Sequence, residues 1–307
     1  MKKIIVALLL TLIASTGFAA EQKLTVALDT MLNAVHAPLI VAQQEGFFRN
    51  QGLEVELINP TPAANAAKLV STGKADIGIT YQPDFIHQLE KSKSLTRIGS
   101  LIDRPLECVV TLKDSNIKTL ADLKGKRIGT NKHDLSGLML KAMLKNAGLS
   151  EKDYSVVTVH HSLNQALLSH QVDAVIGLSR NADVPQLERQ GHKVNVFFPE
   201  ENGIPNYSVL IFMTKTANAQ DPRVPHFLDA LREAVYYLDE HSEHAWRAYT
   251  KANPRANNKL NHDMWFATLP YYAEDPAAFD RDEWQHFADY INKNKLINSH
   301  YALAQKS

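Results

Sequence analysis

Aromatic, amide and imidazole side chains that could hold a small ligand follow the first and third expected strands of the chain. Asn33 and His36 come after the first strand, and Tyr81 and Gln82 come directly after the third. The tyrosine offers a ring face and a hydroxyl, the two amides each offer a donor and an acceptor, and the imidazole can act as either. These residue types predict a site for a small, flat, polar molecule.

Two acidic residues and two helix starts lie near the same loops. Asp29 precedes Asn33, and Asp183 follows a later strand, so either carboxylate could accept hydrogen bonds from an exocyclic amine. Helices expected to begin at Pro38 and at Ser136-Gly137 would aim backbone N–H groups at the ligand, which would also suit an anion. The residues alone therefore do not decide whether the ligand is an amine-bearing ring or an anion.

Alternating strands and helices must position these loops. Strand patterns at Lys23–Leu28, Leu53–Ile58 and Ala75–Thr80 alternate with helical patterns after Pro38 and over Pro62–Thr72, and this rhythm continues to Phe197. Such alternation is typical of βαβ units on parallel sheets. In these sheets, ligands bind beyond the carboxyl ends of the strands, where the loops named above would lie.

The two halves of this region resemble one another. Gly52 and Gly148 are 96 residues apart, and Asp76 and Asp173 are 97 apart, each aspartate standing between a helix and a short strand. The spacing predicts two similar α/β lobes, although any two βαβ units share some of these features. For both aspartates, turn chemistry is the expected role.

Two extended segments are expected to connect the lobes. Leu106–Lys113 would cross from the first lobe to the second, and the apolar strand Asn206–Thr214 would cross back. We expect lobe one to comprise residues 20–107 and 208–307, and lobe two residues 108–207. After Pro222 the pattern is helical, and these helices should pack on lobe one: Val224–His241, Ser242–Ala252, Leu260–Leu269 and Arg281–Asn292. Two lobes joined by two crossings can close around a solute.

The N-terminus has the features of a secretory signal peptide. A basic start at Lys2 and Lys3 precedes an apolar run from Ile4 to Ala14, and small residues allow cleavage after Ala19. The apolar run is shorter than the ~20 residues that a membrane span needs. We expect residues 1–19 to be removed and the mature chain to be exported to the periplasm.

Composition excludes several classes of function. The chain has 33 basic and 33 acidic residues, so nothing indicates a nucleic-acid partner. A single cysteine, Cys108, excludes a disulfide framework and a cysteine-rich metal site. Neither His241 with His244 nor the adjacent His160 and His161 makes a convincing metal site. No nucleophile elbow, P-loop or dinucleotide fingerprint occurs, so we expect no catalytic residue, no metal and no cofactor.

Four stretches of the chain carry a family resemblance. They read H-A-P-L-I-V-A-Q-Q-E-G-F-F-R-N-Q-G-L-E-V-E-L, G-K-A-D-I-G-I-T-Y-Q-P, I-K-T-L-A-D-L-K-G-K-R-I-G and P-E-E-N-G-I-P-N-Y. The chain resembles periplasmic solute-binding proteins of ABC transporters that bind thiamine pyrimidine precursors, of the formylaminopyrimidine or hydroxymethylpyrimidine type. These proteins are related to yeast hydroxymethylpyrimidine phosphate synthase and to binders of nitrate, taurine and alkanesulfonates. The resemblance covers nearly the whole mature chain.

The resemblance implies a fold and a set of ligand-binding residues. The fold would be the two-lobed periplasmic-binding-protein type II fold, α/β, each lobe an open, mostly parallel sheet flanked by helices, with a helical C-terminal segment. Matching the family's motifs residue by residue gives the ligand-binding set Asp29, Asn33, His36, Tyr81, Gln82, Asn181, Asp183 and Tyr207. This chain departs from the motifs at three places: Thr30 replaces a tryptophan, Asp183 replaces a glutamate, and Ser208-Val209 replaces an acidic pair.

Three of these residues also have simple structural interpretations. His36 could cap a helix instead of contacting a ligand, and Tyr81 could be packed in the core. Asp183 could cap the helix that begins near Val184. In the tail, core packing is the expected role of Trp246 and the other two tryptophans.

The function implied by the resemblance is the capture of a thiamine pyrimidine precursor and its delivery to an ABC permease. The expected partners are the heterocyclic solute and the permease, and the family is typically monomeric. Alternatives are a binder of another heterocycle or of a sulfonate- or nitrate-type anion, and a periplasmic sensor domain. A synthase-like enzyme is less favoured, because that family's cysteine-rich iron site has no counterpart beside Cys108.

Overall fold

The computed structural model describes residues 21–294, except 62–64, 92, 131–134 and 161. The predicted signal peptide, residues 1–19, lies outside the described residues. So do His161 and most of the loop between Thr130 and Ser136. None of the helices in the described part of the chain combines the length and the apolar composition that a membrane crossing requires.

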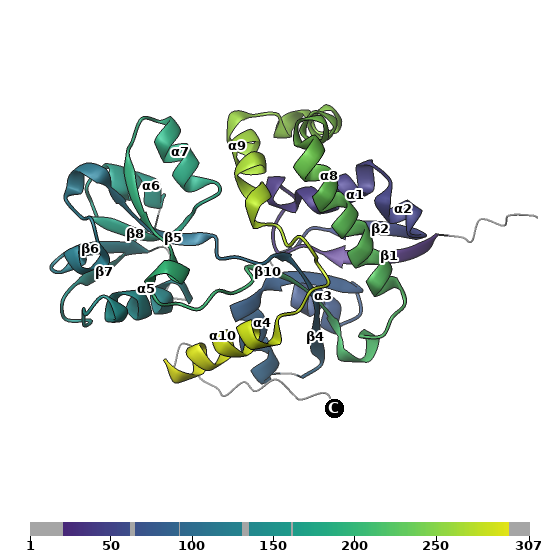
Figure 1. Ribbon diagram of the computed structural model, residues 1–307, viewed down its shortest axis with the longest axis horizontal. Coiled ribbons are helices and arrows are strands. Elements are labelled where there is room, and N and C mark those ends of the chain that lie inside the picture. The colour runs from purple at the N-terminus through teal and green to yellow at the C-terminus, as the bar shows by residue number, and fades with distance from the viewer. Residues whose placement is uncertain (1–20, 62–64, 92, 131–134, 161, 295–307) are drawn as a thin grey trace, which may run out of the picture.

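The strands form two separate five-stranded sheets, one in each lobe (Figure 1). The first sheet has the order β2-β1-β3-β10-β4, built from β1 (Gln22–Ala27), β2 (Leu53–Ile58), β3 (Ile77–Tyr81), β4 (Leu95–Ile102) and β10 (Leu210–Lys215). The second has the order β7-β6-β8-β5-β9, built from β5 (Glu107–Leu112), β6 (Arg127–Thr130), β7 (Ser155–Thr158), β8 (Ala174–Ser179) and β9 (Val194–Phe197). The two-lobed α/β architecture is confirmed.

One strand in each sheet runs against the others. β10 is antiparallel to both β3 and β4, and β5 is antiparallel to both β8 and β9, while the pairs of β1 and β6 are parallel. These are the two predicted crossing segments. A chain that enters a lobe from the hinge starts at the edge where the parallel strands end, so it must run in the opposite direction. The sheets are therefore mixed, with four strands in one direction and the crossing strand in the other.

The helices cover the faces of the sheets. Helices α1, α2 and α8 pack together beside β2, whereas α5, α6 and α7 surround the second sheet. The helical bounds are α1 (Ala37–Gln44), α2 (Phe47–Asn50), α3 (Ala66–Ser71), α4 (Gln82–Lys91), α5 (Leu135–Asn146), α6 (Leu163–Leu168), α7 (Asp183–Arg189), α8 (Arg223–Ala252), α9 (Lys259–Thr268) and α10 (Arg281–Lys293). In Figure 1, α7 and α9 face each other across the lobes, and α10 lies on the other side of the connection.

The C-terminal tail is helical and packs on the first lobe, as predicted. The break expected between His241 and Ser242 is a kink inside α8, because His241 has non-helical backbone angles (φ −130°, ψ 25°) while the helix continues beyond it. Trp246, Trp265 and Trp284 are all buried, which confirms their expected role in the core.

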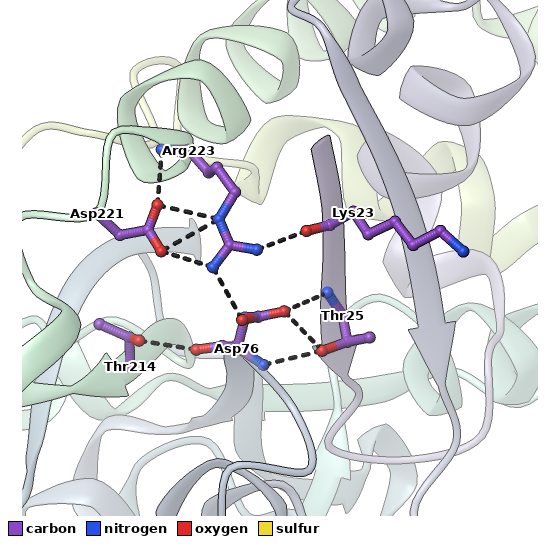
Figure 2. Close-up of polar contacts among 6 residues, drawn as sticks. All are labelled: Lys23, Thr25, Asp76, Thr214, Asp221 and Arg223. Carbon is purple, nitrogen blue, oxygen red and sulfur yellow. Dashed lines mark hydrogen bonds and ion pairs between the residues drawn. The ribbon is translucent and has the colours of Figure 1, made fainter. Parts of the chain in front are cut away.

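A polar network joins strands of the first sheet to the start of α8, at the end of the sheet opposite the predicted ligand-binding loops (Figure 2). The Asp76 carboxylate accepts hydrogen bonds from the backbone and hydroxyl of Thr25 at 2.8 Å each, and from the guanidinium of Arg223 at 3.0 Å. Asp221 holds the same guanidinium, and Thr214 donates to the Asp76 carbonyl. One aspartate thus joins β1, β3, β10 and the start of α8.

The second lobe repeats part of this arrangement, which supports the internal similarity seen in the sequence. Asp173 accepts a hydrogen bond from the backbone of Arg127 at 2.8 Å, as Asp76 does from Thr25. Gly52 and Gly148 both have positive φ, 72° and 82°, a conformation that side chains other than glycine rarely adopt. Both aspartates lie between a helix and a strand, as expected, but the expected turn role of their side chains is wrong, because each carboxylate bonds to the neighbouring strand instead.

Candidate functional site

Asp29, Asn33 and His36 form one hydrogen-bonded group after β1. The backbone N–H of Asn33 donates to His36 Nδ1 at 3.2 Å, so the ring proton sits on Nε2, which donates to Asp29 Oδ1 at 2.9 Å. The Asn33 side chain caps the 3₁₀ turn Ala34–His36 by accepting from Val35. His36 is fully buried, and both of its ring nitrogens are occupied within the protein. Its imidazole therefore holds the Asp29 carboxylate in place.

Tyr81 and Gln82 point to different surroundings, although they are adjacent. Tyr81 ends β3 with 42% of its surface exposed, whereas Gln82 begins α4 and is 1% exposed. The Gln82 side chain accepts a hydrogen bond from the backbone of Ser208 at 2.7 Å, which ties α4 to the second crossing. The exposed ring of Tyr81 is the one available to stack on a ligand.

Three carboxylates lie close enough to the Tyr81 phenol to affect its pKa. The pKa of Tyr81 is raised, first because the surrounding protein removes water from the phenol and then because of the negative charges of Asp29, Glu107 and Asp84. Glu107 begins β5 at the first crossing and accepts a hydrogen bond from the Ser136 hydroxyl of α5 at 2.7 Å. Asp29, Asp84 and Glu107 therefore place carboxylate groups in the neighbourhood of the Tyr81 ring.

Tyr207 lies in the second crossing and is nearly completely buried. Its ring stacks on Phe287 of α10 at 4.7 Å, and its hydroxyl donates to Met139 Sδ of the second lobe at 3.5 Å. Burial raises its pKa, and the charges of Glu107 and Glu200 raise it further. Tyr207 thus stands close to the carboxylates near Tyr81, but as a packed element of the hinge.

The second-lobe candidates follow β8. Asp183 is the first residue of α7, and its carboxylate accepts from the backbone and hydroxyl of Ser179 at 2.8 and 2.9 Å. Asn181 is 2% exposed and donates to the Thr268 hydroxyl at the end of α9 at 2.9 Å. Asn181 therefore joins the second lobe to the C-terminal segment that packs on the first.

Two further contacts join the lobes on this side. Arg189 of α7 forms an ion pair with Asp263 of α9. The Arg180 guanidinium pairs with Glu200 at 2.8 Å and lies over the ring of Phe198 at 3.7 Å and over that of Tyr271 at 5.5 Å. With the Asn181 bond, these contacts hold the two lobes together along α7 and α9.

The structure thus divides the predicted ligand-binding residues. Asp29, Asn33 and His36 form one group, and Asp29 and Glu107 both influence Tyr81, whereas Tyr207 is buried in the second crossing and Gln82 is bonded to it from α4. Asn181 and Asp183 lie on the facing loop of the second lobe with their side chains already bonded. All eight remain predictions as ligand contacts. Sequence reasoning missed Glu107, although its place at the start of the first crossing was a signal that it would lie between the lobes.

Comparison with known proteins identifies relatives over most of the chain. The NMT1/THI5-like family matches residues 33–245. A Haemophilus influenzae protein named for thiamine biosynthesis is 40% identical over 287 residues, covering 93% of this chain and 91% of that protein. The formylaminopyrimidine-binding protein of Halalkalibacterium halodurans is 30% identical over 202 residues, 66% of this chain and 61% of that protein.

More distant relatives include enzymes as well as binding proteins. A 4-amino-5-hydroxymethyl-2-methylpyrimidine phosphate synthase of Legionella pneumophila is 24% identical over 288 residues, covering 93% of this chain and 90% of the enzyme. Among solved structures, the periplasmic aliphatic sulphonate binding protein SsuA from Escherichia coli aligns with a TM-score of 0.71 at 17% identity, covering 91% of this chain and 89% of that one. At that identity the likeness establishes the periplasmic-binding-protein fold.

Proposed function

Since this chain belongs to the NMT1/THI5-like family, we propose that it captures a pyrimidine precursor of thiamine, of the formylaminopyrimidine or hydroxymethylpyrimidine type, and delivers it to an ABC importer. The relative named as a formylaminopyrimidine-binding protein supports the ligand class. The solute-binding fold supports the transport role. Export of the mature chain, from Ala20 onward, is part of the proposal.

The observation that carries the proposal is the exposed Tyr81 ring beside the carboxylates of Asp29 and Glu107. An aminopyrimidine has a flat face that stacks on an aromatic ring and an exocyclic amine that donates to carboxylates. The bond from His36 fixes the Asp29 carboxylate in position, so little freedom is lost when the ligand binds.

The same charges argue against the alternative of an anionic ligand. A sulfonate or nitrate next to the Tyr81 ring would lie close to the carboxylates of Asp29 and Glu107, and like charges in a partly dehydrated site repel strongly. The cation Arg180 of the second lobe is already paired with Glu200. An amine-bearing ring is therefore the better match to this site.

Capture is proposed to occur by closure of the lobes. The ligand would bind first to the loops after β1 and β3, and the loop after β8 would then close over it. The contacts of Asn181 with Thr268 and of Arg189 with Asp263 would stabilise the closed form. Tyr207 and Gln82 act within the hinge that permits the movement.

The second candidate function is that of an enzyme like the related synthases. An enzyme that used the single cysteine would need a reactive thiol, and the surroundings of Cys108 argue against one. The Cys108 thiol is buried in β5, donates to the Leu178 carbonyl at 3.2 Å, and has a pKa raised by burial. A buried neutral thiol is a poor nucleophile and a poor metal ligand. Binding without conversion fits this arrangement better.

Uptake tests the proposed delivery role. A bacterial strain that requires an exogenous pyrimidine for thiamine synthesis would carry the gene together with its permease and ATPase genes. We expect growth on low pyrimidine concentrations to require the mature chain, and mass spectrometry to recover the ligand unchanged from the purified protein. Binding without any effect on uptake would favour a sensor, and a converted ligand would favour an enzyme.

The Tyr81 ring is tested by substitution. Tyr81→Ala should weaken binding of the aminopyrimidine at least tenfold, because it removes the stacking face, and it should leave the melting temperature nearly unchanged. The matched control is Tyr236→Ala, which removes a 57% exposed tyrosine from α8. If both variants bind the pyrimidine as the wild type does, by calorimetry, Tyr81 is not the platform.

A further inference from the structure

Met31 is the most exposed of the large apolar side chains in the described part of the chain, with 61% of its surface accessible. It lies in the loop after β1, between Asp29 and Asn33, two of the predicted ligand-binding residues. A single exposed apolar side chain is ordinary on a protein surface and needs no explanation. The surroundings of Met31 therefore decide whether it has a role.

The loop that carries Met31 lies beside Tyr81. β1 and β3 are parallel neighbours, with Ala27 paired to Gly78, so the loops that follow them leave the sheet at the same edge. The charge of Asp29 raises the pKa of Tyr81, which indicates that the start of this loop is close to the phenol. Two exposed apolar side chains, Met31 and Tyr81, therefore share this edge. The other exposed large apolar side chains of the described residues are on separate elements: Val156, Tyr236, Leu260 and Phe279.

Hydrogen bonds hold the backbone of this loop, while the Met31 side chain faces solvent. The Asn33 side chain donates to the Met31 carbonyl at 2.9 Å, and the Leu32 N–H donates to Asn59 Oδ1 at 2.8 Å. Leu32 packs against the core, whereas Met31 points away from it. A thioether is unbranched and polarisable, and it makes favourable contacts with aromatic rings. Met31 can therefore cover an aromatic ligand that is held against Tyr81.

The Met31 sulfur is also the one that an oxidant in solution reaches most easily among the described residues. Of the other four methionines there, three are at most 1% exposed, and Met264 is partly buried against the core. The Cys108 thiol is completely buried, and burial raises its pKa, so it stays neutral and unreactive. Oxidation of sulfur side chains follows their exposure. Met31 should therefore react first.

We propose that Met31 is a second, apolar contact for the ring that Tyr81 holds, and that oxidation of its thioether by a peroxide weakens capture. This inference rests on the proposed capture of an aminopyrimidine. In the reaction, a lone pair of the sulfur attacks one peroxide oxygen, a sulfur–oxygen bond forms and the O–O bond breaks. The other oxygen takes the proton of the transferred one and leaves as water, or as an alcohol from an alkyl peroxide. The sulfur loses two electrons and the peroxide gains them.

The sulfoxide turns an apolar contact into a polar one. Its oxygen is a hydrogen-bond acceptor, and the face of a pyrimidine ring has no donor to offer it. Closing the lobes over the ring would therefore remove water from this oxygen without replacing the lost hydrogen bonds. Methionine sulfoxide reductases return the sulfoxide to the thioether, so the loss of affinity is reversible.

The test compares the reduced and the oxidised mature chain by calorimetric titration with formylaminopyrimidine and hydroxymethylpyrimidine. Hydrogen peroxide is added until peptide mass spectrometry shows Met31 as the sulfoxide, and is then removed. We expect the oxidised chain to bind the pyrimidine about threefold or more weakly, and methionine sulfoxide reductase to restore the affinity. Bound pyrimidine should also slow the oxidation of Met31. Equal affinity before and after oxidation would overturn this inference alone. Failure of the reduced chain to bind either pyrimidine would overturn the proposed function and this inference with it.

Variants assign the loss of affinity to Met31. Met31→Gln, which is polar like the sulfoxide, should bind the pyrimidine about threefold or more weakly without any oxidant. Met31→Leu keeps an apolar side chain without sulfur, and we expect its affinity to be the same before and after peroxide. The matched control is Met264→Leu, which removes a partly buried methionine from α9 and should stay as sensitive to peroxide as the wild type. Wild-type affinity in Met31→Gln, or a loss of affinity on oxidation of Met31→Leu, would overturn the inference.

Discussion

Replacement of His36 distinguishes a buried support from a direct ligand contact. His36→Leu removes the donor to Asp29, whose side chain is only 6% exposed, and the acceptor of the Asn33 backbone N–H. Because the His36 ring is neutral, the change removes a hydrogen bond to a buried carboxylate and leaves that oxygen without its donor, which costs about 1–3 kcal/mol. For a chain of this size, that loss corresponds to a decrease of roughly 2–10 °C in melting temperature. We expect the variant to lose both stability and affinity.

A graded series makes this prediction sharper. His36→Gln keeps an N–H donor that can reach Asp29, and we expect it to cost about 1–2 kcal/mol, less than the leucine variant. His226→Leu is the matched control, because His226 is exposed on α8, and its cost should stay within about 0.5 kcal/mol. Thermal unfolding measures the loss of stability, and calorimetric titration with the aminopyrimidine measures the loss of affinity. Wild-type stability together with lost binding in His36→Leu would refute the reasoning and make His36 a direct ligand contact.

Three more predictions concern charge. Glu107→Gln should weaken binding of the aminopyrimidine several-fold and reduce discrimination against sulfonates, as calorimetry with both ligands would show; unchanged selectivity would contradict it. Removing the Arg189–Asp263 pair by Arg189→Gln should open the lobes and weaken the ligand by roughly fivefold, about 1 kcal/mol. Small-angle scattering should then give a larger radius of gyration, and an unchanged radius would count against the closure role. Hydrogen bonds from Arg223 hold the pKa of Asp221 below its usual range, so this pair stabilises the fold above about pH 4 and loses its effect as the pH falls through the lowered value. In urea unfolding, the stability difference between the wild type and Arg223→Gln should shrink below that pH. A difference that stays constant down to pH 2 would show that the Asp221–Arg223 pair does not cause it.

Local patterns in the sequence predicted most of the fold. The bounds expected for the second strand, Leu53–Ile58, are those of β2, and the last expected helix, Arg281–Asn292, differs from α10 by one residue. Periodicity and turn residues determine such elements within a few positions. The spacing of Asp76 and Asp173 also pointed correctly to two related lobes. The antiparallel direction of the crossing strands β5 and β10 was harder to predict. It depends on the side from which the chain enters each lobe, which no local sequence pattern indicates.

The site was less predictable, because its contacts are set by packing. Sequence placed Asn33 and His36 in a loop near a ligand, but only the structure shows that both imidazole nitrogens are occupied. Tyr81 and Gln82 were predicted as neighbours in one site, yet the turn from strand to helix sends them to different surroundings. Met31 stands between Asp29 and Asn33 in the sequence, but only the structure shows that its side chain is exposed.

The central claim is tested most directly by calorimetric titration of the mature chain, residues 20–307, with formylaminopyrimidine, hydroxymethylpyrimidine, thiamine, taurine, an alkanesulfonate and nitrate. We expect an aminopyrimidine to bind with a dissociation constant between ~10 nM and ~10 μM, tight enough for capture and weak enough for release. The anions should not bind beside the carboxylates of Asp29 and Glu107. Tight binding of a sulfonate with no binding of any pyrimidine would contradict the account.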